Sequence, residues 1–479
     1  MIRALIGIGL LQFASMLLLL VRTKILATTV GLTGVGTISA VDSLTAVVAQ
    51  TLSLSMPFAT LRFLPAALRV SPEETDLLYR RMRAVMVALL VPATVVCVGI
   101  AIVAPERWGA ALVPYQRTLI LAFASLPVVG LIPFFTNVYA GAIGHRQAMT
   151  LTIAHAGVMV VAAAVAGAGL GVAGFYGAYA LLGTVLIVVA ARRLRIPGLA
   201  MAERRRLSLR DAFRLPPVVW RFAAWLLPLM FAASYTAYFV RYSTLRLFGA
   251  NATGILQGAI GISLSVKALL GTAHGIFLTP HVNRQADPAA RMAWANEFQR
   301  TTGLLFVVTL PPLLLFSDIA LRLLYSAPFR AGSPFVALFV AAEVLTMLSG
   351  TYQSLIIAGD RMRFHVLQNL AAQALLAGTA AVALPRLGLA GAGIAVLTAP
   401  VFMFVSTLVF LDRVWGVHVS RGAVRMSLVA IAILVVAGGI GSRYPGLGAG
   451  LLGAKAALCA AIWLCAYAAI SGDDRLLVR

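Results

Sequence analysis

The stretch LLLLVRTKILATTVGLTGVGTISAVDSL, residues 17–44, decides how the rest of the chain is interpreted. An apolar helix is predicted to end in Arg22 and Lys24, a glycine-rich turn follows, and a second apolar segment carries Asp42. A charge at the centre of a membrane-spanning helix costs about 2.5–3.5 kcal/mol on insertion scales, so it usually faces a cavity or a charged partner. The stretch therefore predicts two spanning helices that line half of a translocation pathway.

The composition of all 479 residues agrees with a membrane location. Hydrophobic residues make up 61% of the chain, charged residues only 11%, and the mean hydropathy is +0.96. Ordinary globular domains are about 25% charged. Apolar runs of about 18 residues or more, which a bilayer core requires of a helix, recur along the whole length. The sequence therefore predicts an all-α polytopic membrane protein.

About fourteen membrane-spanning helices can be drawn on the chain. Their predicted ranges are 4–21, 35–60, 84–104, 118–140, 148–168, 172–191, 218–240, 253–279, 302–320, 334–357, 365–384, 388–411, 424–441 and 450–470. The first run lacks a small-residue cleavage site and continues into Arg22, so we interpret it as an uncleaved span and not as a signal peptide.

The net charge of +23 at first suggests a nucleic-acid partner, but its placement argues against one. The charges are scattered over short loops, and most of the 38 Lys and Arg fall on the side of the N-terminus. Cytoplasmic loops carry such an excess, so both termini are predicted to be cytoplasmic. The most basic loop, residues 192–217, is interpreted as a linker held to anionic headgroups.

The chain also repeats itself, with a nearly constant offset. Four pairs of matches occur in the same order: 21–22 with 240–241, 91–92 with 310–311, 144–146 with 359–361, and 170–174 with 387–391. Six spans per half is an even number, so both halves enter from the same side and form a parallel repeat. The predicted organisation is an N-terminal six-helix lobe at 1–191, a basic cytoplasmic linker at 192–217, a C-terminal six-helix lobe at 218–411 and an additional C-terminal helix pair at 412–479.

Charged residues at matching places in the two halves are the candidate site. The candidates for binding an anion or gating the lobes at a central cavity are Arg22, Lys24, Asp42, Arg241, Arg246, Lys267 and His274. Asp42 is expected to meet Arg241 or Lys267, and Asp42 and Glu343 are candidates for ion coupling. For the basic residues near span ends the alternative is snorkelling to the headgroups, and for Asp42 and Lys267 it is a structural ion pair.

Enzyme signatures are absent from the sequence. It contains no Walker loop, no His/Cys cluster with metal spacing and no nucleophile elbow. The three cysteines lie in apolar runs without ligand spacing. We therefore expect a transporter without a bound cofactor, driven by H⁺ or Na⁺ coupling or by passive flipping, and not an enzyme.

Several segments resemble the polysaccharide transporters of the multidrug/oligosaccharidyl-lipid/polysaccharide (MOP) exporter superfamily. These segments are VRTKILATTVGLTGVG (21–36), RFLPAAL (62–68), TNVYAGAIGHRQA (136–148), LYSAPFRAGSPF (324–335) and QSLIIAGDRMRF (353–364). The resemblance covers about residues 1–411. It implies two six-helix lobes that rock about a central cavity lined by spans 1, 2, 7 and 8.

The resemblance also implies Wzx-type flipping of undecaprenyl-pyrophosphate-linked oligosaccharide across the bacterial inner membrane, for polysaccharide or O-antigen biosynthesis. The expected partners are that lipid, the bilayer, and a polysaccharide polymerase with export proteins; nucleic acid is not among them. A cation-coupled multidrug exporter of the same fold and a lipid II flippase are the alternatives, although the arginine-rich first span of lipid II flippases is missing. A membrane glycosyltransferase or polymerase would need carboxylates on a longer outer loop than the sequence offers.

Overall fold

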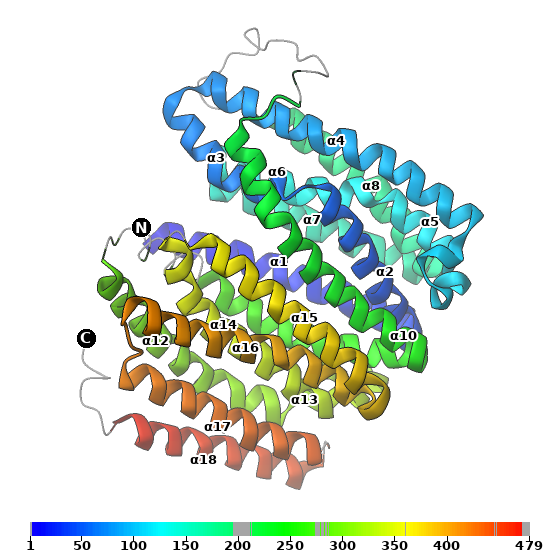
Figure 1. Ribbon diagram of the computed structural model, residues 1–479. Helices are drawn as coiled ribbons and strands as arrows, with labels where there is room; N and C mark the ends of the chain where they lie inside the picture. Colours follow the sequence, from blue (N-terminus) through cyan, green and yellow to red (C-terminus); the bar gives the residue numbers. More distant parts are fainter. Residues whose placement is uncertain are drawn as a thin grey trace. The chain divides into compact units, whose positions relative to one another are not determined.

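The computed structural model describes residues 2–194, 211, 213–273, 278, 282, 285, 287–359, 361–444, 446 and 448–471. All the regular secondary structure of these residues is helical, with no strand (Figure 1). The α-helices of the first half are α1 (Ile2–Thr29), α2 (Gly31–Leu52), α3 (Met56–Val70), α4 (Pro72–Val103), α5 (Gln116–Ala124), α6 (Leu126–Ala142), α7 (His145–Val165) and α8 (Gly171–Arg193). Those that follow are α10 (Pro217–Ala273), α12 (Pro288–Leu315), α13 (Ser317–Leu324), α14 (Ser333–Ala358), α15 (Met362–Leu387), α16 (Leu389–Trp415), α17 (Arg421–Arg443) and α18 (Ala449–Ser471).

Twelve stretches of the described helices are long and apolar enough to cross a membrane. Two of them, His145–Arg193 and Pro217–Lys267, are 49 and 51 residues long. Since about 20 residues suffice for one crossing, each of these two is long enough to cross twice. The predicted fold class of an all-α, multi-pass membrane protein is therefore confirmed.

The backbone repeats where the sequence predicts a repeat. Gly31 separates α1 from α2 with φ of +64°, and Gly249 interrupts α10 with φ of +82°. Gly171 and Gly388, from the two matched motifs, adopt nearly the same conformation, φ/ψ of 60°/−159° and 60°/−142°. Glycine reaches this region without the Cβ clash that other residues meet. The turns before α8 and α16 thus depend on glycines at matched positions, Gly171 and Gly388.

Local sequence explains where several helices begin. The hydroxyl of Ser71 accepts from the backbone N–H of Glu74 (3.0 Å) at the start of α4, and Pro72 occupies the first helical position. Asp287 caps α12 in the same way, through the N–H of Ala290 (3.0 Å). Such caps satisfy backbone donors that have no partner within the helix.

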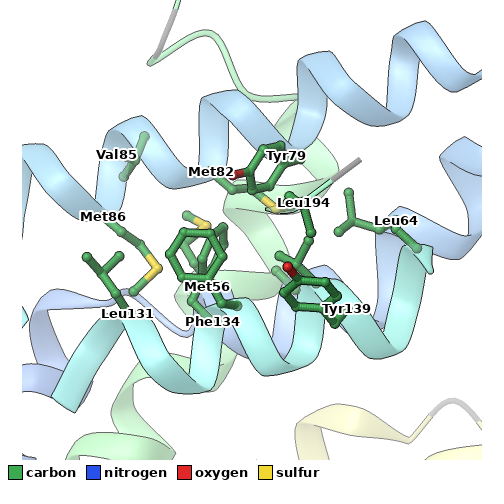
Figure 2. Close-up of a cluster of buried hydrophobic side chains, with 14 of the residues drawn as sticks. Met56, Leu64, Tyr79, Met82, Val85, Met86, Leu131, Phe134, Tyr139 and Leu194 are labelled. Atoms are coloured by element: carbon green, nitrogen blue, oxygen red, sulfur yellow. The ribbon is translucent and has the colours of Figure 1, made fainter. Parts of the chain in front are cut away.

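By its contacts the chain divides into two compact units, residues 1–253 and 254–479. The first part of α10 therefore belongs to the first unit, whereas the sequence repeat begins the second half at residue 218. The core of the first unit lies between α3, α4 and α6 (Figure 2). There Met56 packs among Met82, Met86, Leu131 and Phe134, all of them buried.

In the second unit α12 packs against α14, α17 and α18, while α15 and α16 form an antiparallel pair. Figure 1 shows α17 and α18 side by side at the end of the chain. A buried ion pair fastens α18: the Lys455 ammonium lies 3.2 Å from a carboxylate oxygen of Asp318 in α13. The other oxygen of Asp318 accepts from the N–H of Gly446 (2.8 Å). The charge of this carboxylate is thus both paired and hydrogen-bonded, as a buried charge requires.

Two predicted boundaries are wrong. The first helix does not end at Arg22 and Lys24 but continues to Thr29, which places both cations inside α1. The predicted span 35–60 is broken after Leu52, where Leu54 and Ser55 adopt left-handed φ of 48° and 56°. Pro57 then lies in the first turn of a new helix, α3, a position where its missing N–H costs nothing.

Candidate functional site

Arg22 and Asp42 face one another from α1 and α2, which Gly31 connects. The guanidinium Nη2 lies 3.5 Å from the carboxylate Oδ2. The Arg22 side chain is 18% exposed and that of Asp42 is 43% exposed, so the carboxylate is the more accessible partner. An ion pair in the middle of spanning helices is expected to face a cavity or a polar partner, because unpaired charges there are costly.

A third helix, α8, completes the surroundings of this pair. The phenol of Tyr176 donates to Asp42 Oδ1 at 2.6 Å, and its side chain is buried. The guanidinium of Arg22 also lies over the ring of Phe175, 5.1 Å from its centroid, which is a cation–π distance. The Nε of Arg22 is buried and has no hydrogen-bond partner. Arg22 is therefore held on two sides, and its buried Nε–H has no partner.

The second arginine of the repeat reaches the same helix, α2. Arg241 Nε donates to the hydroxyl of Ser39 (2.9 Å), one turn before Asp42, and its Nη1 donates to the carbonyl of Ala237 (3.1 Å). Ser39 and Asp42 are three residues apart on the same helix, so Arg241 reaches α2 within one turn of the carboxylate. Two guanidinium groups thus flank one carboxylate, and the cluster of Arg22, Asp42 and Arg241 carries one net positive charge.

A cavity of about 330 Å³ lies in the same unit and approaches this cluster through α7 and α8. Its wall includes His155 and Tyr179, whose Nε2 and hydroxyl are 3.0 Å apart. Tyr179 stacks on Phe175, the ring beneath Arg22. The other polar residues of the lining are Gln50, Ser53, Ser55 and Asn137. Hydroxyl and amide groups therefore line a cavity adjacent to the charged cluster.

The remaining predicted site residues are dispersed. Lys24 is half-buried, and Arg246 is exposed near the kink of α10. Lys267 lies 3.5 Å from Glu343 of α14, with side-chain exposures of 51% and 15%. His274 lies outside the described residues. The partner that the structure gives Asp42 is Arg22, and the predicted pairing of Asp42 with Lys267 stays a prediction.

Sequence reasoning missed the residues of α7 and α8 in this site: His155, Phe175, Tyr176 and Tyr179. The available signal was the segment GFYGAY, 174–179, in which aromatic residues stand between glycine and alanine. The two halves differ at these places. The repeat offsets of 219 and 217 relate Asp42 to Gly261 and Tyr176 to Gly393. The second half therefore has neither a carboxylate nor a phenol at the positions that the repeat relates to Asp42 and Tyr176.

No group of three or more His, Cys, Asp or Glu that could hold a metal ion occurs among the described residues. No protein-family model matches the sequence, and no curated protein matches it. Solved structures do match. The lipid II flippase MurJ in an inward closed conformation aligns with a TM-score of 0.69 over 96% of this chain and 97% of its own, at 12% identity. The chain has the MOP transporter fold.

Two other MOP structures show the same similarity. An inward-facing multidrug resistance transporter of the MATE family aligns with a TM-score of 0.61 and 16% identity, over 84% of this chain and 94% of its own. A MOP superfamily transporter from Pyrococcus furiosus, described by a reversed polarity of its binding pocket, aligns with a TM-score of 0.55 and 12% identity, over 90% and 96%. The MOP fold is thus shared at identities too low to indicate a substrate.

Proposed function

We propose that this chain is a transporter that flips a lipid-linked oligosaccharide, carried on undecaprenyl pyrophosphate, across the bacterial inner membrane by alternating access. The observation that carries the proposal is the net positive cluster of Arg22, Asp42 and Arg241 inside membrane-spanning helices. A pyrophosphate is the substrate group that such a cluster would attract most strongly, because guanidinium donates two parallel bonds to phosphate oxygens.

In this proposal Arg22 is the first residue that the phosphate of the substrate contacts. Its Nε has no partner, and its ion pair with Asp42 is long at 3.5 Å. An arriving phosphate would compete with the Asp42 carboxylate for the guanidinium, while Phe175 keeps the guanidinium plane oriented. Loss of the ion pair on binding, and its return on release, would couple substrate occupancy to the packing of α1 against α2.

In this proposal transport is either coupled to H⁺ or Na⁺ or proceeds by passive flipping. If it is coupled, Asp42 and Glu343 are the carboxylates that would bind the ion. Both are paired with a cation in the structure, Asp42 with Arg22 and Glu343 with Lys267. A coupling ion would therefore bind as the cation moves away. Both termini are assigned to the cytoplasm from the placement of Lys and Arg, and a polysaccharide polymerase with export proteins is the expected downstream machinery.

A cation-coupled multidrug exporter is the second candidate, and one observation favours it. Phe231, Tyr235, Tyr238 and Tyr242 of α10 form a continuous aromatic series, with ring centroids 5.4–6.5 Å apart. Phe231 and Tyr235 are exposed. Aromatic faces bind organic cations through cation–π attraction. A lipid II flippase is the third candidate because of the MurJ alignment.

Proteoliposomes that contain the purified full chain distinguish these candidates. Leaflet-specific labelling measures the flipping of undecaprenyl-pyrophosphate-linked sugar, with lipid II and an aromatic organic cation as parallel substrates. We expect flipping of the sugar lipid and a loss of about ten-fold or more in Arg22→Gln, since hydrogen bonds to charged groups contribute about 1.5–3 kcal/mol. The matched control Arg107→Gln removes an exposed arginine of the same unit and should be neutral. Uptake of the organic cation without sugar-lipid flipping would refute the proposal.

A further inference from the structure

A second cavity of the first unit, of about 300 Å³, lies between α6, α7 and α8, away from the charged cluster. Its lining is mostly apolar, with Leu151, Ala154, Leu186, Val189 and Ala190. Neighbouring Val185, Val188 and Val189 of α8 are exposed large hydrophobic side chains. In a multi-pass membrane protein an exposed apolar face of this kind meets lipid, so the cavity opens towards the acyl chains.

The polar members of the lining gather at one end. Gln147 and Thr150 lie in the first two turns of α7, and Arg193 is the last residue of α8. The two helices pack side by side and connect through one turn, so they are antiparallel and these ends coincide. The cavity therefore has an apolar body and a polar, cationic mouth at the level where α8 leaves the membrane.

The charge at this mouth is not balanced by nearby sequence. Arg193 forms no ion pair with any residue that the structure describes. Arg192, next to it in α8, is exposed, and so is Arg146 in the first turn of α7. No Asp or Glu occurs between Glu106 and Glu203. Basic pockets between membrane helices on the cytoplasmic side attract anionic lipid headgroups.

We propose that this cavity is a binding site for an anionic phospholipid, distinct from the transport site. The phosphate lies at the guanidinium of Arg193, and an acyl chain occupies the apolar body beside Ala154 and Leu186. The lipid would fill the space between α7 and α8, the two helices that carry His155 and Tyr176. The proposal depends only on the geometry of the first unit and stands even if the transported substrate is not a sugar lipid.

Native mass spectrometry of the purified full chain with equimolar phosphatidylglycerol and phosphatidylcholine tests the assignment. We expect preferential retention of one phosphatidylglycerol. Arg193→Gln should weaken it about five-fold, because one basic residue near an anionic surface contributes about a factor of five in affinity. Ala154→Leu should weaken it by filling the cavity with the charge intact, and Arg443→Gln, an exposed arginine at the end of α17, should leave it unchanged.

Three outcomes would overturn the assignment. Equal retention of both phospholipids, or retention of phosphatidylglycerol unaffected by both Arg193→Gln and Ala154→Leu, would leave the cavity without this ligand. Stoichiometric displacement of phosphatidylglycerol by undecaprenyl phosphate would assign the cavity to the substrate lipid instead. A thermal unfolding curve for each variant separates loss of the site from loss of the fold.

Discussion

The ion pair between Arg22 and Asp42 should be energetically coupled. Two unit charges about 4 Å apart attract by about 4 kcal/mol at an effective dielectric constant of 20. The Asp42 side chain is 43% exposed, which places the pair between exposed pairs of about 0.2–1 kcal/mol and buried pairs whose disruption costs about 3–5 kcal/mol. We therefore expect a coupling free energy of about 1–3 kcal/mol.

A double-mutant cycle measures this coupling. The free energy of unfolding is determined in mixed micelles by denaturant titration for Arg22→Gln, Asp42→Asn and the double variant. Asp42→Asn leaves Arg22 with Phe175 as its remaining partner, so it should cost more than the same change in the Arg22→Gln background. The control cycle pairs Asp42→Asn with Arg107→Gln and should be additive. Additivity within about 0.5 kcal/mol in the Arg22 cycle would refute the reasoning.

Three further predictions concern single contacts. Tyr176→Phe removes the 2.6 Å hydrogen bond to Asp42 and should lower the free energy of unfolding by about 1.5–3 kcal/mol. A smaller effect of this change in the Asp42→Asn background would confirm Asp42 as the partner, and an equal effect would contradict it. Lys455→Met removes the nearer cation of the buried Asp318 and leaves it Arg330, 3.9 Å away. It should therefore cost less than the about 3–5 kcal/mol of a buried pair that loses its partner outright. The cost is seen as a lower unfolding temperature that a second change, Asp318→Asn, partly restores; no restoration would rule out the pair as the cause. Gly171→Ala forces a residue with Cβ into φ/ψ of 60°/−159° and should lower the free energy of unfolding by about 1–3 kcal/mol, measured by thermal unfolding. The control Gly157→Ala, inside helix α7, should be neutral or stabilising. Equal effects of the two changes would contradict this reasoning.

The sequence was sufficient to predict the helical membrane fold because that fold depends on local and periodic features. Apolar runs of spanning length determine the helices, and the matched glycines, Gly171 and Gly388, determine equivalent turns. The break at Leu54 and Ser55 could not be predicted, since neither residue type favours left-handed backbone. Packing of α3 against α4 and α6 compensates for that local conformation, and packing is not visible in a local pattern.

The site could be predicted only in part, for a similar reason. Charged residues are rare in this chain, so Arg22, Asp42 and Arg241 stood out, and the structure brings all three to α2. Tyr176 did not stand out, because an aromatic residue in an apolar span usually belongs to the core. Its role depends on which face of α8 meets α2, and that is decided by the fold of the whole unit.

The difference between the two halves bears on the proposed mechanism. The repeat preserves an arginine at Arg22 and Arg241 but replaces Asp42 by Gly261, and the second unit instead pairs Lys267 with Glu343. Each unit therefore contains its own acid–base pair, at positions that the repeat does not relate. An anion that takes the cation of one pair leaves the carboxylate of that pair without its partner, whatever happens in the other unit. In the proposed mechanism the two carboxylates would therefore be independent places for a coupling ion. Asp42→Asn and Glu343→Gln should then affect transport separately, with free-energy effects that add.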